Sequence, residues 1–372
     1  MNWLTSQFEL ARSGAGANLK PMEGLRGGAV FLVFLVHYVT LSSPWIAPLS
    51  ATARVADALH TVGNTGVDLF FVLSGYLIYG ALMTRQQRFL PYIRRRVRRI
   101  YPTFSVVLAM YVLLSMALPE QGKLPEAPAE ALRCIAENFL LIAGFTQRGS
   151  IVTVAWSLGY EMVYYLSIPL LIAAFRLRER DVRWRVLFFT TVLSLSAVYC
   201  TAFGGPLRLV MFIAGIYLHE ALDRVRAPAN ALAVAALLAA AVATQLPLAA
   251  IARTGMLFFA FFLLGLCCFG DPRGWLARAF SAWPLRWLGN MSYSYYLLHG
   301  LALKAAFAAL AKVAPPAADG ELFFWIWLAP MFALTLAPCA ALFLLVERPQ
   351  SLAPRRAEPA AKAAGVIPSR DA

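Results

Sequence analysis

The chain has 372 residues, of which 60% are hydrophobic and 14% are charged, and its mean hydropathy is positive. This composition excludes an ordinary soluble domain, which could not cover so much apolar surface with polar groups, and indicates a membrane protein. The 33 Lys and Arg outnumber the 19 Asp and Glu. In a membrane protein such an excess reflects cytoplasmic loops, so we expect membrane lipid and no nucleic acid as a partner.

The predicted elements are apolar runs of about 17 to 25 residues, the length that crosses a bilayer as a helix. A weaker run, residues 134–145, is too short to cross and contains Glu137 and Asn138, so we expect it to be interfacial or re-entrant. The predicted fold is all-α, a polytopic membrane protein of about ten helices. In chain order these spans are 28–44, 63–83, 100–118, 154–175, 184–203, 206–222, 229–249, 254–270, 289–312 and 322–346.

The loops between the spans predict the orientation of the chain. Most Lys and Arg fall in segments that are cytoplasmic if the N-terminus is inside, so both termini are expected in the cytoplasm. The first apolar run lacks a small-residue cleavage site, which predicts an uncleaved first span. We expect a cytoplasmic segment over residues 1–22, a membrane domain over 23–350, and a cytoplasmic, disordered tail over 351–372.

Arg26 and His37 stand eleven residues apart in the first span. This spacing is about three helical turns, so both side chains are predicted on one helix face, about 16 Å apart along the axis. An ionisable group as deep as His37 marks function more often than it fills space, although a hydrogen bond to a neighbouring helix is the alternative. A ligand with an anionic head on Arg26 could present its reactive end near His37, and the phosphopantetheine arm of coenzyme A is roughly that long.

Two acidic residues also lie in predicted spans. Asp68, at the outer end of the second span, could bind acceptor hydroxyls or stabilise the start of its helix. Glu161, in the fourth span, could orient His37 as the acid of a catalytic triad orients its histidine, or pair with a structural Arg or Lys. The residues alone leave both pairs of alternatives open.

A run of arginines precedes the third span. It can anchor the cytoplasmic end of the helix in anionic lipid, or bind phosphate groups through the guanidinium forks. Five arginines exceed what orientation requires, which favours phosphate binding. The run consists of Arg94, Arg95, Arg96, Arg98 and Arg99.

Polar residues form a stripe on the ninth span. Ser292, Tyr296 and His299 are spaced by four and then three residues, which places them on one helix face. Such a stripe predicts a lined cavity with these three as substrate-binding residues, and hydrogen bonding between helices is the alternative.

Metal binding is not expected. The four histidines are scattered without a carboxylate at ligand spacing, and the five cysteines show no CxxC pattern.

Six motifs, in this order along the chain, resemble acyltransferase family 3, a family of integral membrane acyltransferases. They are Arg26 with His37, GVDLFFVLSGYL at 66–77, FLPYIRRRVRRIYP at 89–102, WSLGYE at 156–161, LGNMSYSYYLLH at 288–299 and ERP at 347–349.

The resemblance implies an enzyme of the bacterial inner membrane that moves an acyl group, usually acetyl, from cytoplasmic acetyl-CoA to a hydroxyl. The implied acceptor is a glycan or lipid-linked glycan, such as an O-antigen or an exopolysaccharide. The resemblance also implies that His37 acts as base or acyl carrier, supports a catalytic role for Glu161, and selects Arg95 and Arg99 as donor-binding residues. The alternatives are acylation of a small molecule such as a macrolide, and a transporter or flippase for a lipid-linked sugar, for which no internal repeat is visible.

Overall fold

The computed structural model describes residues 2–9, 19–146, 149–317 and 321–352, and most of the predicted tail, 353–372, lies outside them. Within these residues the regular structure is helical, with no strand. The α-helices are α1 (Asn2–Phe8), α2 (Leu19–Ser42), α3 (Ala51–Gly63), α4 (Thr65–Thr84), α5 (Phe89–Ala117), α6 (Pro128–Phe139), α7 (Trp156–Ala174), α8 (Val182–Phe203), α9 (Met211–Ala221), α10 (Asn230–Gln245), α11 (Ala250–Gly270), α12 (Trp275–Phe280), α13 (Trp283–Asn290), α14 (Ser292–Val313) and α15 (Glu321–Leu342), which continues as a π-helix over Phe343–Leu352.

Eight helical stretches in the described part of the chain are long and apolar enough to cross a membrane, which confirms the all-α polytopic prediction. They coincide with eight of the ten predicted spans. The predicted spans 206–222 and 229–249 are also helical, but α9 and α10 have only 11 and 16 residues. A crossing helix needs about 20 residues. The first residues of the span 206–222 form a 3₁₀ turn, Leu207–Val210, in place of α-helix, and Pro247 ends α10 because proline disfavours a helical backbone at the residue before it.

The predicted outer loop before the second span contains a helix that the prediction lacks. Ser50 caps the start of α3, where its side chain accepts a hydrogen bond from the Ala53 amide at 3.0 Å. The helix α3 runs almost directly into α4, with Asn64 between them. The weaker run at 134–145 is confirmed as too short to cross, since it contains the end of α6 and a single 3₁₀ turn.

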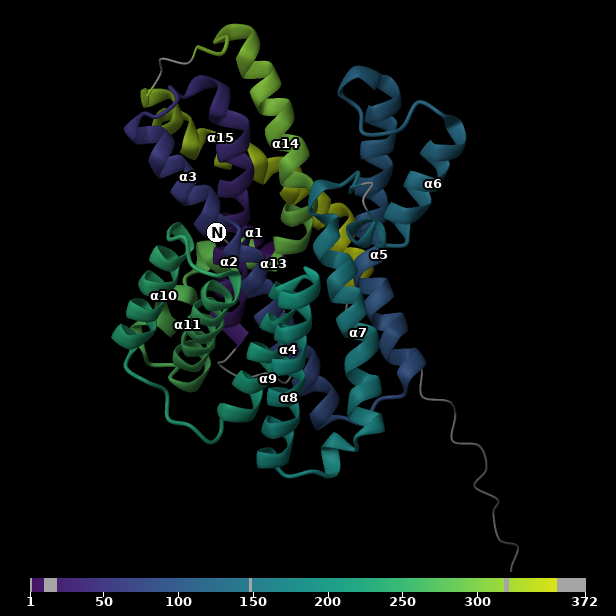
Figure 1. The fold of residues 1–372 in the computed structure, drawn as a ribbon. Helices are drawn as coiled ribbons and strands as arrows, with labels where there is room; N and C mark the ends of the chain where they lie inside the picture. The colour runs from purple at the N-terminus through teal and green to yellow at the C-terminus, as the bar shows by residue number, and fades with distance from the viewer. Residues whose placement is uncertain (1, 10–18, 147–148, 318–320, 353–372) are drawn as a thin grey trace, which may run out of the picture.

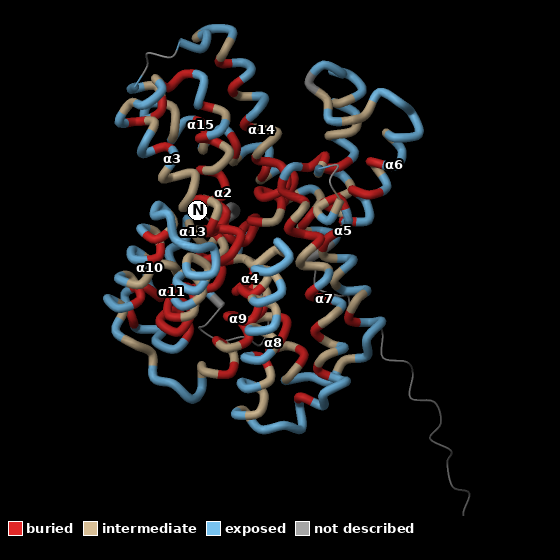
Figure 2. Tube along the Cα trace, viewed as in Figure 1, coloured by how far each residue is buried: buried red, intermediate tan, exposed pale blue. Residues whose placement is uncertain are grey.

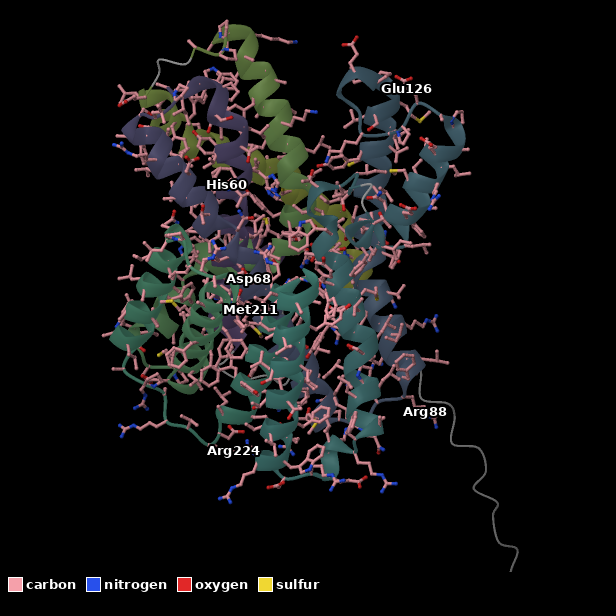
Figure 3. The ribbon with its side chains drawn as sticks, viewed as in Figure 1. His60, Asp68, Arg88, Glu126, Met211 and Arg224 are labelled. Carbon is pink, nitrogen blue, oxygen red and sulfur yellow. The ribbon has the colours of Figure 1, made fainter. Side chains whose placement is uncertain are left out.

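The helices form one body with its core near the middle (Figure 1). Buried residues gather at the centre of the view, where α2 packs against α4 and α13, and exposed residues lie mainly at the ends and on the outer faces (Figure 2). Figure 3 places Arg88 and Arg224 at one end of the molecule and Glu126 at the other. The loops after α4 and after α9 thus share an end, in agreement with the predicted orientation.

Glycines allow two pairs of helices to touch backbone to backbone. A Cβ added at Gly27 of α2 would overlap the Leu285 carbonyl of α13, and one at Gly75 of α4 would overlap the Phe212 carbonyl of α9. Small residues serve this purpose in membrane helices because they let helix axes approach closely. The two contacts fix the depth of Arg26 on α2 and of Ser74 on α4, both of which line the cavity described next.

Candidate active site

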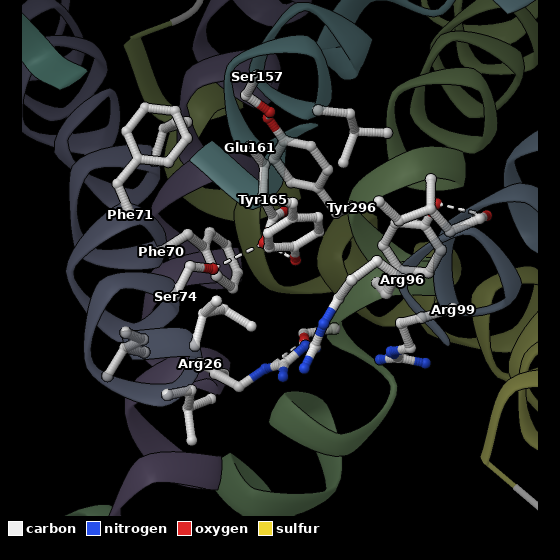
Figure 4. Close-up of a pocket in the computed structure, with 18 of the residues that line it drawn as sticks. Arg26, Phe70, Phe71, Ser74, Arg96, Arg99, Ser157, Glu161, Tyr165 and Tyr296 are labelled. Carbon is white, nitrogen blue, oxygen red and sulfur yellow. Dashed lines mark hydrogen bonds between the residues drawn. The ribbon is translucent and has the colours of Figure 1, made fainter. Parts of the chain in front are cut away.

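A cavity of about 320 Å³ lies between α2, α4, α5, α7 and α14 (Figure 4). This volume is at the lower end of the range for ligand sites, about 300 to 1,000 Å³. One end carries arginines, one wall is apolar, and the rest carries hydroxyl groups and a carboxylate. The lining residues are Arg26, Val67, Phe70, Phe71, Leu73, Ser74, Leu77, Ile78, Ala81, Arg96, Arg99, Ile100, Ser157, Leu158, Glu161, Tyr165, Ser292, Tyr293 and Tyr296.

Three arginines from two helices gather at one end of the cavity (Figure 4). Arg26 of α2 donates two hydrogen bonds to the Ser292 hydroxyl of α14, at 3.2 and 3.0 Å. Arg99 of α5 forms an ion pair with Glu347 at 2.6 Å. Arg96 has no carboxylate within ion-pair distance among the described residues, and its buried Nε has no hydrogen-bond partner there. Its guanidinium instead lies over the Tyr165 ring, 5.5 Å from the centroid.

The angular position of each arginine around the axis of α5 decides whether its side chain reaches the cavity. Arg96 and Arg99 are three residues apart and therefore share one face of the helix. Arg95, predicted as a donor-binding residue, is turned by about 100° from Arg96, lies exposed and donates to Gln87 outside the cavity. The structure therefore brings Arg26 and Arg99 together as predicted and puts Arg96 where Arg95 was expected.

Glu347 supports this end of the cavity from the π-helical segment after α15. It is fully buried, pairs with Arg99, and accepts hydrogen bonds from the Ser294 amide at 3.0 Å and the Ser294 hydroxyl at 2.6 Å. In the sequence, Glu347 stands out only as part of the closing motif and has no predicted role. Its signal is a glutamate directly after an apolar span, which needs a cationic partner if it is buried.

Glu161 lies in the cavity wall among hydroxyl groups. Its Oε1 accepts hydrogen bonds from the Ser74 hydroxyl at 2.7 Å and the Tyr165 hydroxyl at 2.5 Å. Its Oε2 has no hydrogen-bond partner among the described residues, although Glu161 lines the cavity. The carboxylate thus keeps acceptor capacity on the cavity side.

The two histidines singled out in the sequence lie against each other. The ring centroids of His37 on α2 and His299 on α14 are 5.0 Å apart, with an angle of 66° between the rings. His37 is half-buried, whereas His299 is fully buried and its Nδ1 lies 2.8 Å from the Tyr295 carbonyl oxygen. Neither histidine lines the cavity, but Tyr296 lines it and its ring centroid is 6.5 Å from that of His299.

Two contacts between α2 and α14 support the predicted shared face of Arg26 and His37. Arg26 bonds Ser292, and His37 meets His299 further along the same pair of helices. The structure does not bring Glu161 to His37, because Glu161 is bonded by Ser74 and Tyr165. The predicted role of Glu161 in orienting His37 therefore has no direct contact to act through.

The predicted substrate-binding residues divide into two groups. Ser292 and Tyr296 line the cavity, and the Tyr296 hydroxyl lies 2.8 Å from that of Ser157. Asp68 lies outside the cavity in the first turn of α4, where it pairs with Arg208 at 3.1 Å. This geometry agrees with the structural alternative for Asp68 and leaves its acceptor-binding role a prediction. In the described part of the chain no group of three His, Cys, Asp or Glu residues could hold a metal ion.

Comparisons with known proteins identify the family of this chain. Residues 20–344 match the family model described as "Acyltransferase domain", acyltransferase family 3. The peptidoglycan O-acetyltransferase OatA of Listeria monocytogenes is 27% identical over 318 residues, 75% of this chain and 48% of that protein. Acyltransferase MdmB of Streptomyces mycarofaciens is 26% identical over 331 residues, 77% of this chain and 79% of that protein.

A shorter match covers the exopolysaccharide production protein ExoZ of Rhizobium meliloti, 30% identical over 108 residues, 28% of this chain and 33% of that protein. The chain spans between 48% and 60% of the length of the first curated relatives it matches. No solved structure matches it.

Proposed function

Because this chain belongs to acyltransferase family 3, we propose that it is an O-acyltransferase of the bacterial cytoplasmic membrane that moves an acyl group, acetyl in the simplest case, from acyl-coenzyme A to a glycan hydroxyl. One observation carries the proposal. A cavity with an arginine end also contains Glu161 and Tyr296, and the Tyr296 ring lies 6.5 Å from that of His299, which in turn contacts His37. An anionic donor and a hydroxyl acceptor therefore each have matching groups in the cavity, and the proton acceptor His37 lies beyond its wall, in contact with His299.

The donor end is assigned to Arg26, Arg96 and Arg99. Glu347 balances the charge of Arg99, whereas Arg96 has no such partner among the described residues, so the cluster favours an anionic ligand. Guanidinium groups suit phosphate and pyrophosphate, the charged groups of coenzyme A. Ser292 adds a hydroxyl at the same end. The apolar wall with Phe70 suits the uncharged arm that carries the thioester.

The transfer requires one proton to move between the two substrates. The acceptor oxygen forms a bond to the thioester carbonyl carbon, the carbon–sulfur bond breaks, and the hydroxyl proton passes through His37 to the departing sulfur. Neutral imidazole suits this task because it takes and returns a proton near neutral pH. Holding both substrates in one cavity supplies the remaining acceleration through orientation.

The glycan acceptor is supported by the relatives, since OatA is named for peptidoglycan and ExoZ for exopolysaccharide production. One finding favours a second candidate, acylation of a small molecule. The match to MdmB covers 79% of that protein, a larger share than the match to OatA. The two candidates differ only in the acceptor and share the donor site.

The proposal is tested by single-turnover incubation of the protein in lipid nanodiscs with acetyl-labelled acetyl-CoA. We expect thiol release and label transfer in the wild type, a loss of about 10²-fold or more in His37→Ala, and near wild-type rates in the control His60→Ala. Equal thiol release from wild type and His37→Ala would contradict the mechanism. Movement of a lipid-linked sugar without a gain in mass would support transport instead.

A further inference from the structure

The two ring nitrogens of His299 have different surroundings. Nδ1 lies 2.8 Å from the Tyr295 carbonyl oxygen, and a carbonyl oxygen can only accept a hydrogen bond. Nδ1 therefore carries the proton, and the lone pair of the neutral ring is on Nε2. The Tyr295 ring, stacked on His299 with centroids 5.3 Å apart and an angle of 9°, holds the imidazole plane in place.

Nε2 of His299 is a buried acceptor without a donor. The residue has no exposed surface, and Nε2 has no hydrogen-bond partner among the described residues. Native proteins pair nearly all buried polar atoms, so an unpaired one in a site requires an explanation. A neighbouring donor that reaches Nε2 by rotation of its side chain would satisfy this acceptor.

His37 is the donor within reach. Two imidazoles joined by an N–H···N bond have centroids about 5 Å apart, and those of His37 and His299 are 5.0 Å apart. The rings meet at 66° and His299 Nε2 has no partner among the described residues, so a hydrogen bond between the two rings requires the half-buried His37 ring to rotate. The Tyr296 hydroxyl is also near His299, but it already bonds the Ser157 hydroxyl and the Val154 carbonyl.

We propose that His299 is a positioning residue for His37, an inference that rests on the proposed function. Its Nε2 accepts the N–H of His37, which fixes the tautomer whose other nitrogen is free to take the acceptor's proton. When the new carbon–oxygen bond forms, that proton makes His37 an imidazolium, which Nε2 stabilises until the proton passes to the departing thiolate sulfur. His299 thus takes the orienting role that the sequence suggested for Glu161, in place of the substrate-binding role predicted for His299.

Two amide substitutions separate the two nitrogens of His299. The asparagine amide reaches the position of Nδ1, so His299→Asn keeps a donor to the Tyr295 carbonyl and loses the acceptor. The glutamine amide reaches the position of Nε2, so His299→Gln keeps an acceptor facing His37. Both variants are isolated in nanodiscs, and their thermal unfolding is compared with that of the wild type before activity is measured.

The first readout is thiol release from acetyl-CoA with N-acetylglucosamine tetramer offered as acceptor. We expect His299→Asn to lower kcat by about 10²-fold with the KM for acetyl-CoA unchanged, and His299→Gln to recover about a tenth of the wild-type kcat. The second readout is NMR of ¹⁵N-labelled histidine, which reports tautomers directly. We expect one tautomer of His37 in the wild type and in His299→Gln, and a mixture in His299→Asn.

Three outcomes overturn the proposal. The first is equal kcat in the Asn and Gln variants, and the second is an unchanged His37 tautomer in His299→Asn. The third is a raised KM for the tetramer at unchanged kcat, which would make His299 a substrate-binding residue. If the wild type releases no thiol with the tetramer, this glycan is not an acceptor, whereas the tautomer measurement still tests the contact between the two histidines.

Discussion

Two clusters in this protein combine a glutamate, a tyrosine and an arginine in opposite ways. In the first, which we call the closed cluster, Glu220 accepts from the Tyr79 hydroxyl at 2.6 Å, and Arg185 donates to both of its oxygens at 2.7 Å. In the second, the open cluster, Glu161 accepts from Tyr165, while Arg96 lies over the Tyr165 ring and forms no hydrogen bond to the carboxylate.

The difference between the clusters shows what separates a structural charge from a functional one. In the closed cluster the charges neutralise each other, and Glu220 is only 3% exposed, so a ligand finds no free donor or acceptor. In the open cluster the arginine and the glutamate both face the cavity and keep hydrogen-bonding capacity. The two clusters contain the same residue types, and they differ in whether the arginine and the glutamate keep unused hydrogen-bonding capacity.

The largest effect is expected from removing the charge of the glutamate in each cluster. Glu161→Gln keeps the shape and the acceptor for Ser74 but loses the anion beside the reacting groups, so we expect turnover to fall about 10²- to 10³-fold. Glu220→Gln should leave turnover per folded molecule within about twofold and lower the unfolding temperature. Thiol release per folded protein measures the turnover of both variants. If the two variants lost the same share of turnover, the open cluster would be no more functional than the closed one.

The next effect is a loss of stability in the closed cluster. Arg185→Met leaves Glu220 buried without its bidentate partner, which we expect to reduce the free energy of unfolding by about 3 to 5 kcal/mol. Thermal unfolding can be followed by thiol labelling, because Cys134, Cys267 and Cys339 are buried. The matched double variant Arg185→Met with Glu220→Met should recover most of the loss. A double variant as unstable as the single one would contradict the ion-pair explanation.

A smaller effect separates neighbouring arginines on α5. Arg96→Met should weaken binding of coenzyme A about 10- to 100-fold, because a charge-assisted hydrogen bond contributes about 1.5 to 3 kcal/mol. Arg95→Met should leave binding unchanged, since Arg95 lies outside the cavity. Calorimetric titration with coenzyme A measures both dissociation constants. If Arg95→Met weakened binding as much as Arg96→Met, the arginine run would act through its overall charge alone.

The smallest effect concerns the tyrosine hydroxyls. Tyr79→Phe removes one of several bonds to Glu220 and should lower the free energy of unfolding by about 1 to 2 kcal/mol without changing turnover. Tyr165→Phe should instead lower turnover a few-fold, because it loosens Glu161 in the cavity. Paired measurements of unfolding temperature and thiol release show which quantity each variant changes, and the reverse pattern would exchange the assignments of the two clusters.

Local features of the fold were predictable from the sequence. The length of the apolar runs predicted where the helices lie, and helical spacing predicted that Arg26 and His37 face the same neighbouring helix. Both predictions depend on residues that are close in the chain. Helix length was less predictable. A 3₁₀ turn at Leu207–Val210 and a proline at 247 shorten helices inside apolar runs that are long enough to cross a membrane.

Contacts between distant segments were not predictable. Ser74 and Glu161 are 87 residues apart in the chain, and Arg99 and Glu347 are 248 apart, so no local pattern relates them. The choice between Arg95 and Arg96 also required the structure, because the apolar residues Ile93, Val97 and Ile100 do not mark the buried face of the helix, and Val97 is 38% exposed. The pairing of His37 with His299 likewise depends on how α2 and α14 pack.

The two ends of the helix α5 have different surroundings. The first half carries Arg96 and Arg99 into the cavity, whereas Leu113 and Met116 near the other end are 65% and 68% exposed and would contact acyl chains. On the opposite wall, the glycine contact between α2 and α13 leaves Arg26 little freedom to move. A single helix therefore joins the arginine end of the cavity to a surface that faces the hydrocarbon of the bilayer.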